Sequence, residues 1–483
     1  MLARQIFDRW LDRLPLDWYA LLFFLLAILA GSMIGLAVII VLGPLKSVAA
    51  LVGLFIAILA VMRPETGLLA FVFVTYTRFS DVLVDLGAPS IAKPFVGLLV
   101  GVIVLRWALY NERPQKWQTP AILVSIYGVV IFSSLIYASD VTSAENAFSD
   151  YIKDAVITVI MVMMIQKQST FRQAIWALLA AGIFLGSISV YQYLTSSWSN
   201  DFWGFGQAPY LNISGATEGV RLGGPIGDPN YYAQIMLALI PLAFNRLTSE
   251  KAILPRVIAG WAFGVCVLTV IFTYSRGAFL AMMIMLIVMS IYRPPRLIDV
   301  ILAALMMTIL LRFVPATYLQ RLVSLSDILG GSNDIRGEVS FRGRASEMTV
   351  GIQMFLDHPL LGVGMQNYPN YYQQYSRRLG MDPRTENREP HSLYLEIASE
   401  TGLAGLLTFG AILWAIFSRL RNAFLTLKRK NDQHNAEATA ALMVAMIGYL
   451  TAAIFIHGAF PRFFYLLAGI SMASLQVAQA QTD

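Results

Sequence analysis

One histidine and two glutamates stand directly before a long apolar segment. The stretch HSLYLEIASETGLAGLL begins at His391, carries Glu396 and Glu400, and leads into an apolar run that predicts a helix over 402–418. A neutral imidazole readily accepts a proton near neutral pH. We interpret His391 as a candidate general base for an attacking hydroxyl group, with Glu396 or Glu400 orienting its ring. The structural alternatives are an interfacial histidine at a helix start and, for Glu400, a residue that marks the break before the helix.

Four arginines lie in short motifs that could hold an anion. Guanidinium groups are planar, stay charged near lipid and can contact two oxygens of one phosphate. Arg276 stands in TYSRGAFLA between two apolar runs. Arg221 opens the glycine-rich RLGGPIGDPNYYA, where backbone N–H groups could form an anion nest. Arg342 and Arg344 begin FRGRASEMTVGIQMF, which has the apolar spacing of an amphipathic helix that lies on the membrane surface or on the bundle.

Each of these residues also has a structural explanation. Arg276 could be an arginine that reaches the outer membrane interface, and Arg221 an ordinary loop charge. Arg344 could pair with Glu347 one helical turn on. Asp228 is a further candidate for the site, but a cap for the helix that follows explains it better, because Asp favours that position.

Aromatic residues and a histidine-proline pair complete the list of candidates. Tyr368 and Tyr371 stand in NYPNYYQQYSRR, where they could anchor the chain at the interface or serve as platforms for a glycan or an acceptor. His358 begins HPLLGVG, which we interpret as a structural turn because it is rich in glycine.

The composition identifies a membrane protein. The chain of 483 residues is 57% hydrophobic and 13% charged, whereas soluble domains have about 25% charged residues. Backbone groups in hydrocarbon must bond within their own segment, so apolar runs of about 20 residues predict transmembrane helices. The first run is too long for a signal-peptide core of about 7–15 residues, so we expect it to remain as a helix. Helices are expected over 18–42, 47–62, 66–83, 91–109, 119–137, 151–166, 171–192, 231–245, 254–273, 277–292, 297–314, 402–418, 438–457 and 460–477.

These segments predict an all-α, polytopic transmembrane bundle of 12–14 helices, the lower number applying if 47–62 and 66–83 form a re-entrant pair. Residues 1–314 would form a bundle with an interfacial N-terminal segment and an outer loop near 196–230. Residues 315–401 would form a large outer loop with the candidate catalytic segment, and 402–483 the C-terminal helices. The single cysteine excludes an intramolecular disulfide, and scattered histidines without CxxC or HExxH spacing predict no metal site and no cofactor.

Basic residues divide unequally between the two sides of the predicted bundle. Nineteen of the 35 lysines and arginines fall in loops assigned to the inner side, as the positive-inside rule requires. The net charge of +6 therefore needs no nucleic acid to explain it. Short outer loops and outer helix ends hold fewer: Lys46, Arg78, Lys93, Lys153, Arg221, Arg276, Arg312 and Arg462.

Taken together, the four motifs over roughly residues 200–410 resemble the O-antigen ligase and O-antigen polymerase superfamily, bacterial envelope glycosyltransferases of the GT-C type. The chain departs from that family at Ser392, where the family often has asparagine. The resemblance implies a multi-pass protein of the bacterial inner membrane with its active site facing the periplasm. It implies transfer of a glycan from undecaprenyl diphosphate to a glycan or lipid A-core acceptor, without metal. A lipid diphosphate would then be the anion for the arginines.

Several functions fit the sequence. A ligase and a polymerase differ only in the acceptor. For a polymerase the acceptor is a second lipid-linked glycan. A protein acceptor is a further alternative. A flippase or exporter of lipid-linked sugars belongs to another class. It would be expected to place charges at mid-membrane depth on broken helices, open to both sides. A structural scaffold is the third class, but it would not require an arginine in a nearly loopless hairpin. The candidates gather on one side, which favours an enzyme.

Overall fold

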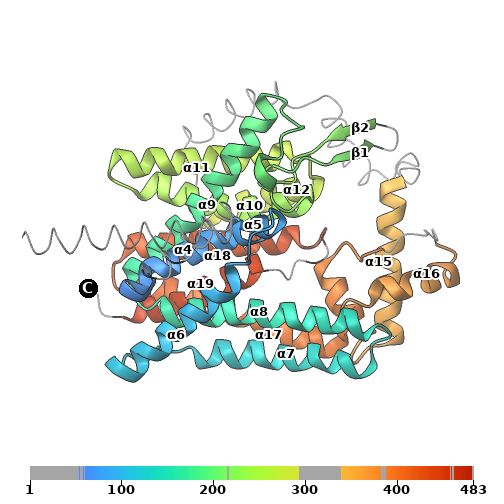
Figure 1. The fold of residues 1–483 in the computed structure, drawn as a ribbon, viewed down its shortest axis with the longest axis horizontal. Helices are drawn as coiled ribbons and strands as arrows, with labels where there is room; N and C mark the ends of the chain where they lie inside the picture. The colour runs from blue at the N-terminus through green and yellow to red at the C-terminus, as the bar shows by residue number, and fades with distance from the viewer. Residues whose placement is uncertain are drawn as a thin grey trace, which may run out of the picture.

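The computed structural model describes residues 60–214, 217–292, 339–381, 388–456 and 462–480, with Leu54, Ile58 and Gly458. These residues form a helical bundle with one antiparallel hairpin of two short strands (Figure 1). The elements are α4 (Pro64–Tyr76), α5 (Phe79–Asp85), α6 (Ala92–Tyr110), α7 (Gln118–Tyr137), α8 (Val141–Met164), α9 (Gln168–Leu194), η1 (Phe202–Gly204), β1 (Tyr210–Ser214), β2 (Thr217–Val220), α10 (Pro229–Ser249), α11 (Ile253–Phe272), α12 (Arg276–Tyr292), α15 (Val339–Asp357), α16 (Tyr368–Arg378), α17 (Leu393–Arg429), α18 (Gln433–Ala452) and α19 (Arg462–Gln479).

The prediction of a polytopic helical membrane protein is confirmed. Within the described residues, α6, α7, α9, α11 and α17 are long and apolar enough to cross a membrane. The count of five becomes six if α4 and α5, which meet at a bend of 57°, form one span. The helices expected over 18–42 and 297–314 lie outside the described residues, and the one over 47–62 lies largely outside them.

Four predicted helices have clearly different limits in the structure. One of them, expected over 438–457, runs from 433 to 452 as α18. The expected helix over 66–83 is broken into α4 and α5, because Arg78 adopts a left-handed conformation with φ of 55°. The helix expected over 151–166 begins ten residues earlier, where Asp140 caps α8 by accepting from Ser143 N at 3.1 Å. The helix expected over 402–418 runs from 393 to 429 as α17. Charged and polar residues interrupt the apolar runs of α8 and α17, and hydropathy alone does not detect the turns that lie beyond them.

Contacts at each end of the bundle join loops that the charge pattern assigned to the same side. We call these ends the inner end and the outer end. Inner-end contacts are Arg246 Nη1–His434 Nε2 at 2.9 Å, Asn435 Nδ2–Gln168 Oε1 at 2.9 Å and Arg419 Nη2–Lys116 O at 3.0 Å. Outer-end contacts include Ser139 Oγ–Asn367 Oδ1 at 2.9 Å and Arg462 Nη1–Asp81 Oδ1 at 3.0 Å. The assignment of the outer end to the periplasm stays a prediction.

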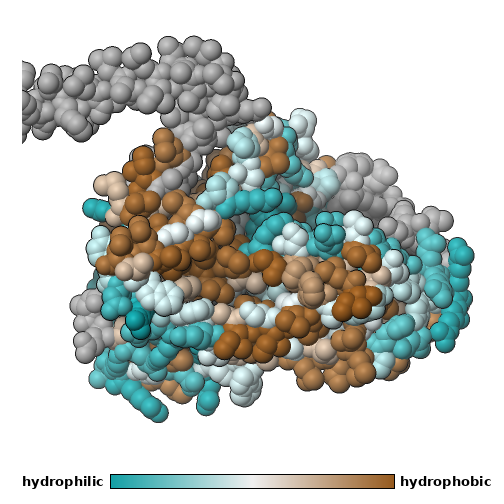
Figure 2. All heavy atoms as spheres, turned by 60° about the horizontal axis from the view of Figure 1, so that its bottom comes forward, coloured by the Kyte–Doolittle hydropathy of each residue, from teal (hydrophilic) through white to brown (hydrophobic). Residues whose placement is uncertain are grey.

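The surface of the bundle is apolar between these ends. Figure 2 shows a broad apolar belt on the face that carries α6, α7 and α8, with hydrophilic residues beyond it on either side. In the interior, α10 and α19 are buried on nearly all sides. A helix that is apolar around its whole circumference is typical of such a central position.

The segment 339–401 forms a cap across the outer end. There α15 stands across the ends of α7, α8 and α17 and packs against α16 and α17 (Figure 1). Val350 and Met354 of α15 are buried against α16. The amphipathic helix predicted in this segment is confirmed, but its expected apolar face points outward, since Met348 and Ile352 are 40% and 48% exposed.

The turn 358–364 joins α15 to α17 by backbone contacts. Leu403 N donates to Pro359 O at 2.8 Å, and Gly364 N donates to Glu400 O at 2.9 Å. This interpretation of HPLLGVG as a structural turn is confirmed. The contact depends on two glycines with left-handed backbones, Gly362 at φ 69° and Gly402 at φ 63°. A Cβ at Gly402 would lie 2.5 Å from the carbonyl carbon of Leu360.

We expect Gly402→Ala to destabilise the protein strongly. Alanine at this backbone conformation costs on the order of 1–3 kcal/mol, and the clash with Leu360 adds to that cost. Thermal unfolding in detergent should show a lower Tm and loss of monodisperse protein. Gly410→Ala is the matched control, because Gly410 lies on the same helix with no atom within 4 Å of an added Cβ. Equal Tm values for the two variants would contradict the proposed role of the Gly402 contact.

Candidate active site at the outer end

His391 lies at the entrance to α17 beside a buried carboxylate. Its backbone is left-handed, with φ of 45°, and its side chain is 29% exposed. Its Nε2 lies 3.5 Å from Oε2 of Glu347, a residue of α15 that is almost fully buried. The other oxygen of Glu347 lies 3.6 Å from Nη1 of Arg388. A non-glycine residue in this conformation is uncommon and is often found at functional sites.

Two tyrosines hold the α15 backbone around Glu347. Tyr368 donates from its hydroxyl to Glu347 O at 2.6 Å, and the Tyr372 hydroxyl lies 3.0 Å from Ser346 Oγ. Both rings are fully buried. The interpretations of Tyr368 as a lipid anchor or a glycan platform are therefore wrong, because its ring belongs to the core between α15 and α16. Tyr371 is half-buried at the edge of the same core.

Glu396 and Glu400 bind backbone N–H groups instead of the histidine ring. Glu396 Oε2 accepts from Gly458 N at 2.6 Å. Glu400 accepts from Gln366 N at 2.8 Å and from Tyr368 N at 3.2 Å. Glu400 thus fixes the start of α16 and stands two residues before the non-helical Gly402, so its interpretation as the mark of a helix break is confirmed. Glu347, not Glu396 or Glu400, is the carboxylate nearest to the imidazole among the contacts described here.

Arg221 is anchored in the protein by its guanidinium group. The side chain is buried, with Nε donating to Thr273 O at 2.8 Å and Nη2 donating to Asn230 Oδ1 at 3.1 Å. It thereby holds the turn between α11 and α12. The glycine-rich stretch was expected to form an anion nest. Three of its backbone N–H groups, those of Gly223, Ile226 and Gly227, instead donate to backbone carbonyls and cannot bind an anion.

The capping role of Asp228 is confirmed, since Oδ1 accepts from Asn230 N and Tyr231 N, both at 2.8 Å. Arg276 is the first residue of α12 and is half-buried. The aligned N–H groups at a helix start favour an anion nearby. Arg342 and Arg344 both belong to α15, and Arg344 is half-buried. Glu347, the predicted partner of Arg344, faces Arg388 and His391.

The connection between α18 and α19 contacts three of these positions. A Cβ on Gly277 would lie 2.8 Å from Cβ of Phe455, so the start of α12 packs closely on this connection. Leu393 N donates to Ala453 O at 3.0 Å, which fixes the start of α17. Gly458 N contacts Glu396, as described above. The starts of α12 and α17 and the carboxylate of Glu396 therefore border one short stretch of chain.

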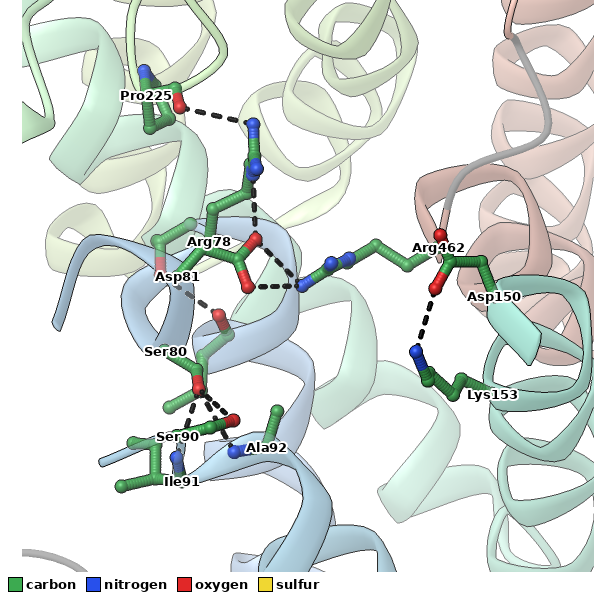
Figure 3. Close-up of polar contacts among 12 residues, drawn as sticks. Arg78, Ser80, Asp81, Ser90, Ile91, Ala92, Asp150, Lys153, Pro225 and Arg462 are labelled. Atoms are coloured by element: carbon green, nitrogen blue, oxygen red, sulfur yellow. Dashed lines mark hydrogen bonds and ion pairs between the residues drawn. The ribbon is translucent and has the colours of Figure 1, made fainter. Parts of the chain in front are cut away.

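A polar cavity of about 590 Å³ opens beside this connection. Glu396 and Gly458 line it, together with residues of α5, α6, α8 and α19. Arg462 reaches both oxygens of Asp81, at 3.0 and 2.9 Å, and Arg78 Nε reaches Asp81 at 2.8 Å (Figure 3). Arg78 also donates to Pro225 O at 3.3 Å, which ties the cavity wall to the glycine-rich stretch.

In the sequence, no motif that indicates a role surrounds four of the outer basic residues: Arg78, Lys93, Lys153 and Arg462. Lys93, Lys153 and Arg462 line the cavity, and Arg78 borders it through Asp81. The acidic residues Asp150 and Asp154 of α8 line it as well and were not singled out. The sequence did contain an indication of the role of these cations. The positive-inside rule disfavours basic residues on the outer side, so each one there suggests a local structural or functional role.

The described residues contain no group of three His, Cys, Asp or Glu side chains that could hold a metal ion. Metal-independent chemistry stays a prediction. The arrangement offers a partly exposed imidazole beside a buried carboxylate. Five residues further along the chain, Glu396 lines a cavity with both acidic and basic residues on its walls.

Glu389, two residues before His391, gives the site a pH dependence. Burial raises the pKa of Glu389 from 4.5 to about 7. The folded protein therefore keeps this proton at pH values where the unfolded chain has lost it, so stability falls as pH rises from about 4.5 to 7.

We expect Glu389→Gln to reduce this fall in Tm across that range. Glu145→Gln changes an exposed glutamate and should reproduce the wild-type curve; equal curves for all three proteins would contradict the assignment.

Comparison with known proteins adds one finding. Residues 261–410 match the family described as O-antigen ligase. No curated protein matches the chain. The matched segment runs from α11 into α17 and contains Arg276, Glu347 and His391, whereas Arg221 and most of the cavity lie outside it. The match covers about a third of this multi-pass membrane protein, which is similar to the O-antigen ligase family over that segment.

Proposed function

We propose that the protein transfers a glycan from undecaprenyl diphosphate to an acceptor hydroxyl at the periplasmic face of the bacterial inner membrane, as an O-antigen ligase does. The observation that carries this proposal is the contact between His391 and Glu347 at the outer end. The polar cavity is lined by Glu396, five residues after His391. The family match adds support, because the family implies a lipid-linked glycan and an acceptor as substrates.

His391 would act as the general base. Its Nε2 lies 3.5 Å from Oε2 of Glu347, an oxygen that accepts no hydrogen bond from the described residues. In the proposed reaction Nε2 carries the hydrogen that faces this carboxylate and Nδ1 carries the lone pair. Nδ1 takes the proton of the acceptor hydroxyl while its oxygen forms a bond to the anomeric carbon. The bond from that carbon to the diphosphate oxygen breaks, and its electron pair leaves with undecaprenyl diphosphate. Glu347 stabilises the imidazolium that results.

Cations would stabilise the leaving group. Arg276 combines a guanidinium group with the start of α12, two features that favour a diphosphate. Arg344 and Arg342 of α15 are the further candidates. Arg221 would act indirectly, since it holds the carbonyl of Thr273 and thereby the turn before Arg276. Cations at the leaving oxygen meet the need of a diphosphate, which requires charge stabilisation more than a proton.

Two other functions draw on specific features. A polymerase would use the same donor site and differ only in taking a lipid-linked acceptor. An exporter of lipid-linked sugars is favoured by the 57° bend between α4 and α5, since charged residues stand at this break. Purified protein that forms a glycosidic bond between donor and acceptor in detergent, where no compartments exist, would separate an enzyme from an exporter.

We expect His391→Ala to lower the transfer rate by about 10²–10⁴-fold, the usual contribution of a general base. Glu347→Gln should lower kcat while leaving the KM for the donor near the wild-type value, because Glu347 positions the base and does not hold the donor. Glu347→Asp should restore part of the rate. The measurement is the initial rate with purified protein and lipid-linked donor at matched folding.

The control for these variants is Asp357→Asn, which changes an exposed carboxylate at the end of the same helix. It should leave the rate unchanged. Substantial transfer by folded His391→Ala would return His391 to a structural role at the start of α17.

Arg276→Lys tests the geometry of the cation. Lysine keeps the charge but loses the planar fork that engages two oxygens. One charge-assisted hydrogen bond contributes about 1.5–3 kcal/mol, so we expect a loss of transfer of about 10- to 100-fold. Arg378→Lys on α16, an exposed arginine at the outer end, is the matched control. Activity of Arg276→Lys within about twofold of wild type, well inside the tenfold that 1.36 kcal/mol represents, would make Arg276 an interfacial anchor.

A further inference from the structure

An apolar groove of about 510 Å³ runs between α6, α7 and α8. Val104 and Trp107 line it from α6, Val129 from α7 and Val159 from α8. Ser125, Tyr151 and Trp107 are the described lining residues that carry a side-chain oxygen or nitrogen, and the Tyr151 hydroxyl donates to the carbonyl of Val124. The walls therefore offer packing surface and almost no hydrogen-bonding groups.

The groove adjoins the polar cavity at the outer end, because the two share lining residues. Tyr151, Ile152 and Val156 of α8 line both spaces. On α6, Lys93 and Val96 line the cavity.

Further along the same helix, Val100, Val104 and Trp107 line the groove. From Lys93 to Trp107 these positions are spaced three or four residues apart, so they share one face of α6. Fourteen residues of helix span about 21 Å, roughly two thirds of the hydrocarbon core of a bilayer. The wall thus leads from a charged mouth far into the membrane.

Lys93, at the charged mouth of the groove, is a basic side chain without a described partner. Within the part of the chain that the structure describes, Lys93 forms no ion pair or hydrogen bond, and its side chain is exposed. Lys153 pairs with Asp150 at 2.7 Å in an exposed contact, and Arg462 pairs with Asp81. Lys93 is accordingly the cation most free to meet a phosphate where the groove begins.

We propose that this groove binds the polyprenyl chain of the lipid-linked substrate, and that Lys93 makes the first contact with its phosphate, before the diphosphate reaches Arg276. The proposal rests on the proposed function for the presence of such a substrate and adds where its chain lies. Apolar walls gain little over lipid from hydrophobicity alone, so selectivity comes from packing along the groove and from the charge at its mouth. One narrow groove that adjoins one polar cavity fits a single chain with a large head group better than it fits a lipid with two acyl chains.

The test measures binding to the full-length protein in phosphatidylethanolamine–phosphatidylglycerol nanodiscs. The probes are undecaprenyl diphosphate and uncharged undecaprenol. Val129→Trp should weaken binding of both probes by about tenfold, which is 1.4 kcal/mol. Ile122→Trp is the matched control, because both residues are exposed aliphatic positions on α7, at 67% and 56%, and only Val129 lines the groove. Lys93→Gln should weaken binding of the diphosphate alone.

Equal binding by wild type and folded Val129→Trp, or equal weakening by the Ile122→Trp control, would overturn the proposal. A benzophenone side chain at position 129 gives a second readout, since it should crosslink undecaprenyl diphosphate in preference to bilayer phospholipid. Crosslinking of phospholipid to the same extent would assign the groove to ordinary lipid. These binding readouts do not depend on catalysis. Absence of glycan transfer together with the expected binding pattern would contradict the proposed function and leave the groove assignment in place.

Discussion

The backbone contact between the 358–364 turn and α17 determines how the whole outer cap is placed. Leu403 N and Gly364 N each bond across this contact, and Gly402 leaves the space that the turn occupies. α15 leads directly into this turn, so the contact fixes α15 and with it Glu347. Glu347 lies beside His391, so the packing of this turn against α17 sets the distance between the carboxylate and the imidazole. Loop-borne functional groups require this kind of rigid support.

Charges at the outer end are arranged so that few are left alone near lipid. Burying an isolated charge is costly, whereas a charge with a partner and hydrogen bonds is tolerated. Glu347 has His391 and Arg388 as partners, and Asp81 has Arg78 and Arg462. The cost is lowest at the mouth of the bundle, where water still reaches the groups. Under the proposed function, a lipid-linked donor presents its diphosphate at this depth, beside the titratable residues that stand directly before a membrane-spanning helix.

Much of this architecture could be predicted from the sequence, and the failures have physical causes. Hydropathy located α6, α7, α11 and α12 to within one or two residues, because their limits coincide with the limits of apolar runs. It missed the early starts of α8 and α17, where charged and polar residues interrupt the apolar run. The motifs predicted His391 as a candidate, but not its partner, because Glu347 is 44 residues away and only the fold of the outer cap brings the two together. Spacing alone could not distinguish Arg221, which binds backbone and Asn230, from an arginine that faces a ligand.

The polar cavity shows how the charge pattern of a membrane protein can indicate a site that motifs do not. The positive-inside rule makes each basic residue on the outer side an exception. Lys93, Lys153 and Arg462 are three such exceptions from three different helices, and all line one cavity. Arg462 is already engaged by Asp81, so an entering diphosphate would have to share that guanidinium group with a carboxylate. Lys93 carries no such competitor within the described residues. The first contact of an anion with this cavity is therefore expected at the start of α6, where the apolar groove also reaches the cavity, and an amphiphile that satisfies both would be oriented before its sugar reaches the outer cap.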